Sequence, residues 1–172
     1  AAGPAMQRAQ AVAAVEAGIE VVQKLAAEGI QAIGAGEMGI GNTTASSTVL
    51  AALAGLAADE VTGRGTGITD AMLDHKIQVI NRALECNQPD PQDPLDVLAK
   101  VGGFEIGAIA GAVLAGAAAR LPVLVDGFIS TAGALLASAL TPACREYLFA
   151  SHRSAERGHV LMLEKLGLDP LL

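Results

Sequence analysis

Apolar residues recur at helical spacing along the first segment of the chain, residues 4–28. When this segment is wound at 3.6 residues per turn, the apolar side chains fall on one face and leave the polar ones on the other. Gly29 follows the segment and is typical of a residue that ends a helix. The pattern therefore predicts an amphipathic helix whose buried face carries Ala11, Val15, Ile19, Val22 and Leu25.

Three short apolar runs, residues 30–33, 121–125 and 147–150, are each followed by a polar or glycine-containing turn and then by a helical pattern. We interpret the runs as β-strands. The run at 121–125 (LPVLV) is typical of a strand that is buried on both faces. Strands that alternate with helices predict parallel pairing through right-handed crossovers.

Capping residues indicate where the intervening helices begin. Asn42 or Thr43 is a suitable N-cap for the helix after the first run, and the helix after the second run is expected to start at Ser130. Thr69 or Asp70 can cap a further helix, which carries Lys76 and extends through Leu84.

Two connections and a glycine-rich helix complete the expected elements. Residues 59–67 form a turn-rich connection, and a short helix over residues 96–102 can be capped by Asp93 or Asp96. The helix over residues 104–120 has small residues every four positions, so a neighbouring backbone can pack closely against one of its faces. The glycines concerned are Gly103, Gly107 and Gly111.

These elements predict an α/β fold, a Rossmann-like three-layer domain with a parallel sheet flanked by helices. Residues 1–172 are expected to form a single α/β nucleotide-binding core. Ligands of such folds gather at the carboxyl ends of the strands. Those ends are expected to carry Glu37, Asp126, His152 and Ser154.

Composition narrows the possible partners. The chain is 52% hydrophobic but has only three Phe, one Tyr and no Trp, so its core must be built from small aliphatic side chains. A formal net charge of -7 argues against binding to nucleic acid or to anionic membranes, because both depend on basic patches. A small-molecule or protein partner is expected instead.

The remaining sequence signals argue against a disulfide framework, a metal site and a membrane span. Cys86 and Cys144 lie far apart without a C-x-x-C partner, which fits a reducing cytoplasm. His152 and His159 lack acidic or cysteine partners at ligand spacing, so no metal and no resident cofactor are expected. The uncharged stretch at 106–119 is shorter than the roughly 20 residues of a spanning helix.

The loop GAGEMGIGNTT at residues 34–44 matches two nucleotide-binding signatures at once. Its spaced glycines satisfy the dinucleotide pattern G-x-G-x-x-G, and GEMGIGNT within it would be a Walker A loop if Asn42 were a lysine. Asparagine carries no charge to neutralise transferred phosphates, so NTP hydrolysis is not expected. The dinucleotide pattern requires an acidic residue at the end of the next strand, but Asp59 follows a helical run.

Both signatures share one mechanism that the loop still satisfies. The backbone amides of a glycine turn and the N-terminus of the following helix form a site for an anion such as phosphate. Glu37 would repel a pyrophosphate in that position, but it could accept a proton or face an oxocarbenium-like sugar. A nucleoside monophosphate that reacts at C1 of its ribose would satisfy both features.

Four segments of the chain carry a specific resemblance: residues 34–47 (GAGEMGIGNTTASS), 102–118 (GGFEIGAIAGAVLAGAA), 122–137 (PVLVDGFISTAGALLA) and 151–159 (SHRSAERGH). Together they closely resemble the nicotinate-nucleotide:dimethylbenzimidazole phosphoribosyltransferases of cobalamin biosynthesis. The resemblance implies transfer of 5-phosphoribosyl from nicotinate mononucleotide to a nitrogen of 5,6-dimethylbenzimidazole, with inversion at C1. The implied products are α-ribazole phosphate and nicotinate.

The resemblance also implies roles for individual residues. Glu37 would be an auxiliary active-site carboxylate, whereas the main base of the family is a glutamate in a G-E-G-type motif that is not found in residues 1–172. The chain is therefore expected to be a fragment of a longer protein and to be inactive or nearly so alone. The implied substrate-binding residues are Gly36, Gly39, Gly41, Asn42, Thr43, Lys76, Asp126, Gly127 and Ser154.

The residues themselves are also compatible with two other functions. An NAD-dependent oxidoreductase domain requires a strand that ends at Asp59. A non-catalytic binding or dimerisation module is the second alternative. The glycine-rich helix and small-residue core also suggest a packed interface between two copies, so a homodimer is expected.

Overall fold

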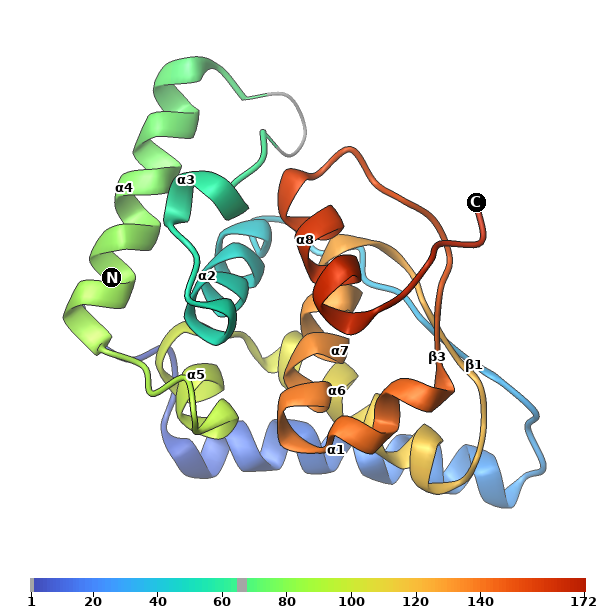
Figure 1. Cartoon of the computed structure of the whole chain (residues 1–172). Helices are drawn as coiled ribbons and strands as arrows, with labels where there is room; N and C mark the ends of the chain where they lie inside the picture. Colours follow the sequence, from blue (N-terminus) through green and yellow to red (C-terminus); the bar gives the residue numbers. More distant parts are fainter. Residues whose placement is uncertain (1, 65–67) are drawn as a thin grey trace.

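The computed structural model describes residues 2–64 and 68–172. Helices make up most of the chain, and three short strands form a parallel sheet in the order β1-β2-β3 (Figure 1). The α/β fold with a parallel sheet flanked by helices is confirmed. The elements are α1 (Arg8–Ala27), β1 (Ile33–Ala35), α2 (Thr43–Ala54), α3 (Ala58–Val61), α4 (Asp70–Asn87), α5 (Pro94–Val101), α6 (Phe104–Ala118), β2 (Val123–Val125), α7 (Gly127–Leu140), η1 (Pro142–Tyr147), β3 (Leu148–Ala150) and α8 (Arg157–Leu166).

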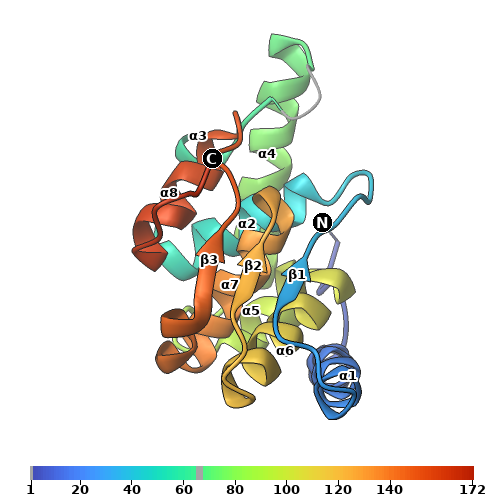
Figure 2. The same cartoon turned by 90° about the vertical axis from the view of Figure 1, so that its right-hand side faces the viewer.

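The three strands are aligned so that their carboxyl ends meet at one edge of the sheet. Ile33 pairs with Val123, which pairs in turn with Leu148. In Figure 2 the strands lie nearest the viewer and α6 and α7 lie behind them. The central residues of β2 and β3 point away from these helices, and Leu124 and Phe149 are 37% and 46% exposed.

This exposure contradicts the expectation that residues 121–125 form a strand buried on both faces. The strand is shorter, Val123–Val125, and its middle residue is exposed. An uninterrupted apolar run does not distinguish burial on two faces from burial on one, because only the packing of other elements decides it.

The first strand also begins later than its apolar run predicts. Residues 30–32 carry the chain away from the end of α1, where Gly29 has a φ of 88°. Strand pairing starts at Ile33, whose N–H donates to the carbonyl of Pro122 at 2.9 Å, and continues through Ala35. The first residue of β1 is therefore determined by its pairing with β2 and not by the hydrophobicity of residues 30–33.

The caps of two helices agree with the sequence prediction. The Thr69 hydroxyl accepts a hydrogen bond from the N–H of Met72 at the start of α4. The Asp93 carboxylate does the same for the N–H of Asp96 at the start of α5. Side-chain acceptors at these positions replace the partners that the first amides of a helix lack.

Two other segments differ from expectation. Helix α7 starts at Gly127, immediately after the N-cap Asp126, and not at Ser130. The connection expected over residues 59–67 contains the short helix α3, and its residues 65–67 lie outside the described residues. Because Asp59 is inside α3, the strand end required for the NAD-dependent oxidoreductase is missing, and that alternative is wrong.

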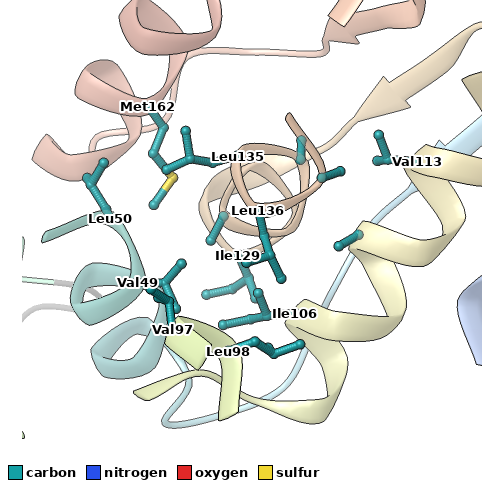
Figure 3. Packing of buried hydrophobic residues seen from close by; sticks show 14 of the residues in the cluster. Val49, Leu50, Val97, Leu98, Ile106, Val113, Ile129, Leu135, Leu136 and Met162 are labelled. Carbon is teal, nitrogen blue, oxygen red and sulfur yellow. The ribbon is translucent and has the colours of Figure 1, made fainter. Parts of the chain in front are cut away.

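Helix α7 lies at the centre of the hydrophobic core and contacts α2, α6 and α8 (Figure 3). Eleven of its 14 residues are buried, so its polar side chains are cut off from water, and that of Ser130 has no hydrogen-bond partner among the described residues. Leu136 and Ile129 of α7 lie near Ile106 of α6 and Val49 of α2, while Met162 of α8 packs from another side.

Helices α1 and α6 approach each other at backbone contact. A β-carbon on Gly18 would overlap the carbonyl oxygen of Ala108, and one on Gly111 would overlap that of Val15. A β-carbon on Gly107 would also meet α1 at 2.9 Å. Gly107 and Gly111 of the predicted glycine face are therefore confirmed as a packing surface against α1 of the same chain, whereas a β-carbon on Gly103 would meet the side chain of Glu105 instead.

Among the helices of residues 2–64 and 68–172, none combines the length and apolar character that crossing a bilayer requires.

We predict that Gly18→Ala lowers the free energy of unfolding by about 1–3 kcal/mol, because the added methyl group forces α1 away from α6. Gly34→Ala is the control, since a β-carbon at that position meets no atom of the described residues within 4 Å. Urea unfolding of both variants and of the unsubstituted chain measures the effect. Equal stability of the two variants would contradict the close packing.

Candidate active site

A cavity of about 690 Å³ lies between the glycine loop after β1 and one face of α4. The loop and the first turn of α2 contribute residues 39–44, and α4 contributes Met72, His75 and Lys76. Asn42 is the N-cap of α2 but makes no side-chain hydrogen bond to the first amides of that helix. The N-terminus of α2 therefore faces the cavity with its partial positive charge.

Lys76 is the cation that α4 directs toward this loop. Its ammonium donates hydrogen bonds to Oγ1 of Thr43 at 3.0 Å and to the carbonyl of Gly63 at 3.4 Å. Burial lowers the pKa of Lys76, and the negative charge of Glu156 opposes that change. A half-buried ammonium beside loop amides and a helix N-terminus favours an anion such as phosphate.

A second cation, Arg64, also lines the cavity. Its guanidinium pairs with Asp70 at the start of α4 and donates to the carbonyl of Ile68 at 3.1 Å. Two cations therefore border one cavity on a chain whose formal net charge is -7. Although Asp70 offsets the charge of Arg64, cationic side chains in the lining favour an anionic small molecule.

The Glu37 carboxylate closes the glycine loop on itself. One oxygen accepts from the N–H of Gly39 at 2.6 Å, and the other accepts from Nδ2 of Asn42 at 2.8 Å. A β-carbon on Gly39 would meet the Glu37 carboxylate and lie 3.0 Å from Asn42 Nδ2, so a larger residue there would displace these two flexible side chains. The two groups that donate to the carboxylate, the N–H of Gly39 and Nδ2 of Asn42, are also candidate donors to a phosphate.

A second polar cluster lies at the carboxyl ends of β2 and β3. Oδ1 of Asp126 accepts from the Ser151 hydroxyl at 2.6 Å and lies 3.1 Å from Nδ1 of His152. The hydrogen bond from Ser151, together with His152, lowers the pKa of the Asp126 carboxyl. A β-carbon on Gly36 would lie 3.9 Å from the other oxygen of Asp126, which brings the glycine loop next to this cluster.

His159 of α8 lies behind this cluster and is 1% exposed. Its Nε2 is 3.0 Å from Oγ1 of Thr131, and its Nδ1 accepts from the N–H of Ser154 at 3.1 Å. Burial lowers the pKa of His159 from 6.5 to about 4, assisted by His152 and opposed by Asp126. The imidazole is therefore neutral near pH 7.

The structure thus sorts the predicted site residues into two neighbouring groups. One lines or closes the cavity, and the other surrounds the strand ends at Asp126. Gly36 lies between them, because it neighbours Asp126. The first group comprises Glu37, Gly39, Gly41, Asn42, Thr43 and Lys76, and the second comprises Asp126, Gly127 and Ser154.

Sequence reasoning missed several residues of this region. Arg64 and His75 border the cavity, but nothing in their local sequence distinguishes them from solvated surface residues. His159 carried a usable signal, because helical spacing places it on the same face of α8 as Met162, Leu163 and Leu166, all of which are buried. A buried histidine on an apolar face requires partners, and these are Thr131, 28 residues away, and Ser154, five residues away.

Comparison with known proteins identifies relatives of the whole chain. A family model described as Phosphoribosyltransferase matches residues 1–172. The chain is 60% identical over 170 residues to a nicotinate-nucleotide--dimethylbenzimidazole phosphoribosyltransferase of Geotalea uraniireducens (strain Rf4), covering 99% of this chain and 48% of that protein. It is 59% identical over 172 residues to the protein of the same name from Desulforudis audaxviator (strain MP104C), covering 100% and 49%.

Solved structures show the same correspondence. The crystal structure of CobT from Thermus thermophilus superposes with a TM-score of 0.94 at 50% identity, over 99% of this chain and 51% of that one. A structure of the nicotinate-nucleotide-dimethylbenzimidazole phosphoribosyltransferase from the same organism gives 0.89 at 48% identity, over 99% and 50%. The chain spans about half the length of the relatives that it matches.

We predict that burial of neutral His159 makes the chain less stable as pH falls from 6.5 to 4. The unfolded chain takes up a proton on this imidazole near pH 6.5, whereas the folded chain does so only near pH 4. The free energy of unfolding therefore decreases across this window by up to about 3 kcal/mol, and the loss is complete below pH 4.

Urea unfolding at several pH values, for the unsubstituted chain and for His159→Gln, measures this contribution. The amide of glutamine does not titrate, so the difference between the two proteins isolates the imidazole from the carboxylates that titrate in the same range. A difference that stays constant between pH 6.5 and 4 would show that His159 is not held neutral.

Proposed function

Because the chain belongs to the nicotinate-nucleotide--dimethylbenzimidazole phosphoribosyltransferase family, we propose that it forms the nicotinate mononucleotide site of such an enzyme. The reaction would transfer 5-phosphoribosyl to 5,6-dimethylbenzimidazole and give α-ribazole phosphate and nicotinate, a step in assembling the nucleotide loop of cobalamin. The observation that carries the proposal is the cavity bordered by Lys76, the glycine loop and the N-terminus of α2.

The phosphate is the part of this substrate that the cavity suits best. Lys76 already donates to Thr43, so a phosphate oxygen beside both groups would receive two donors without rearrangement of α4. The N-cap side chain Asn42 does not accept from the first amides of α2. These amides are therefore further donors for the phosphate. No metal is needed for this neutralisation, because fixed positive charge and amide dipoles supply it.

The ribose would then lie toward the strand ends, where Gly36 adjoins Asp126. Nicotinate leaves from a pyridinium and needs no general acid, whereas the benzimidazole must lose a proton as it attacks C1. A negative carboxylate near C1 stabilises the positive charge that develops on the sugar. We assign that electrostatic role to Glu37, once its contacts within the loop are released.

In our proposal, residues 1–172 alone do not carry out the whole reaction. We expect the main base to be supplied by a segment outside residues 1–172, so the chain alone should bind nicotinate mononucleotide but transfer little. We also propose a cytoplasmic location, since an exposed free thiol at Cys86 and a buried one at Cys144 suit a reducing compartment.

A binding or dimerisation module is the second candidate, favoured by the outer face of the sheet. Leu124 and Phe149 are exposed there and border a hollow of about 200 Å³. The homodimer stays a prediction, but the surface expected to form its interface changes. The glycine face of α6 is already occupied by α1, so a second copy would have to use another surface such as this one.

We predict that Lys76→Met weakens binding of nicotinate mononucleotide by about 10- to 100-fold, because the phosphate loses its half-buried cation. Isothermal titration calorimetry on the folded chain measures the affinity. Lys24→Met is the control, since it removes an equal charge from an exposed position on the last turn of α1. Equal weakening by both variants would mean that only net charge matters.

We predict that Glu37→Gln reduces transfer at least about 100-fold while changing the affinity for nicotinate mononucleotide less than about threefold. Glutamine can still accept from Gly39, but it carries no negative charge for the sugar. The assay uses a chimera in which residues 1–172 replace the matching half of the Geotalea uraniireducens relative.

Formation of α-ribazole phosphate by the unsubstituted chimera is the reference for this measurement. If that chimera binds nicotinate mononucleotide but forms no product, the binding-module alternative is favoured. If the Glu37→Gln chimera is as fast as the reference, the carboxylate has no electrostatic role.

A further inference from the structure

The start of α7 and the loop after β3, both at the carboxyl end of the sheet, contact one buried side chain, His159 of α8. Helix α7, which follows β2, reaches it through Thr131, whose Oγ1 is 3.0 Å from Nε2. The loop after β3 reaches it through Ser154, whose backbone N–H and hydroxyl lie 3.1 Å and 2.8 Å from Nδ1. Both ring nitrogens are therefore partnered by segments that are far apart in sequence.

The partners determine where the imidazole carries its hydrogen. A backbone N–H can only donate, so Nδ1 must accept from Ser154 and cannot be protonated. A neutral ring then carries its hydrogen on Nε2 and donates it to Thr131. The Thr131 hydroxyl is left free to donate to the carbonyl of Gly127, which lies 2.7 Å away.

These bonds form a continuous chain from Ser154 through His159 and Thr131 to Gly127. Gly127 has a φ of 85°, in the left-handed region that side chains with a β-carbon rarely adopt. Its carbonyl is held by Thr131, and its neighbour Asp126 is held by Ser151 from the other loop. The turn is therefore fixed from the buried side and from the exposed side.

We propose that His159 is a positioning residue, which sets the Gly127 turn and the Ser154 loop at the separation that the phosphoribosyl group requires. This inference rests on the proposed function, because the resemblance places Gly127 and Ser154 at the substrate. The His159 side chain is 1% exposed and lies behind the Gly127 turn and the Ser154 loop. It acts on them only through Thr131 and Ser154.

The surroundings of the ring favour this role over metal binding or simple packing. His152, with its ring centre 6.0 Å away, and Asp126 are the titratable groups that face it, and no set of three metal-ligating side chains occurs in the described part of the chain. Phe128 meets the ring at its edge. A leucine or methionine would fill this space at lower desolvation cost, so the hydrogen bonds distinguish histidine from an apolar residue.

A pair of substitutions at Thr131 tests the proposal. Thr131→Val removes the hydroxyl and breaks the chain of bonds, whereas Thr131→Ser keeps it. Thr48→Val is the matched control, because Thr48 is also buried on a helix and donates to the carbonyl four residues earlier, so its hydrogen bond stays within its own helix. His159→Asn keeps an acceptor near Ser154 and loses the donor to Thr131.

Titration calorimetry with nicotinate mononucleotide is expected to give about 10-fold weaker binding for Thr131→Val and His159→Asn. Thr131→Ser and Thr48→Val should bind within about twofold of the unsubstituted chain. If Thr131→Val unfolds at a lower temperature but binds as tightly as Thr48→Val, the role is merely structural and the proposal is overturned. If the unsubstituted chain itself does not bind, the proposed function fails instead.

The tautomer provides a second test that does not involve the substrate. In ¹⁵N-labelled protein, the one-bond coupling to hydrogen identifies which ring nitrogen is protonated, and His159→Asn identifies the signal among the three histidines. A hydrogen on Nε2 supports the chain of bonds. A hydrogen on Nδ1 is incompatible with the Ser154 contact and overturns the proposal.

Discussion

The turn at Gly127 takes the chain directly from the central strand into a helix that is buried over most of its length. A buried helix has no access to water for its polar groups, and its start carries two buried hydroxyls, of which Ser130 has no hydrogen-bond partner among the described residues whereas Thr131 has one on another segment. Thr131 finds His159, and through it the loop after β3. Thr131 and His159 therefore connect the start of α7 to the loop after β3, and this edge of the sheet is where the site residues lie.

Small residues make that burial possible. α6 lies against α7 on one side and against α1 on the other, and Gly111 and Gly18 allow backbone contact between α1 and α6. A core with few aromatic side chains gains its stability from many short contacts, so it tolerates little added volume. The same close packing leaves α4 on one side of the molecule, where Lys76 can border an open cavity (Figure 1).

The sequence allowed the order of elements, the parallel sheet and the glycine loop to be predicted, because periodicity and capping residues are local signals. It did not predict that Leu124 is exposed, since exposure depends on which elements cover the sheet. Arg64 could not be assigned to the cavity, because only the folding of the chain brings it to the same cavity as Thr43. The partners of His159 could not be predicted either, because Thr131 and Ser154 come from elements whose packing brings them to it.

The glycine loop cannot hold a phosphate at the Gly39 amide and keep Glu37 there at the same time. An N–H group has a single hydrogen to donate, and two anions at 2.6 Å from one nitrogen would also repel each other. A phosphate that takes this amide must release the carboxylate, whereas one held by Lys76 and Thr43 alone need not. In the first case phosphate binding itself delivers a negative charge toward the sugar, so that occupancy of the anion site and stabilisation of the reacting ribose become a single event.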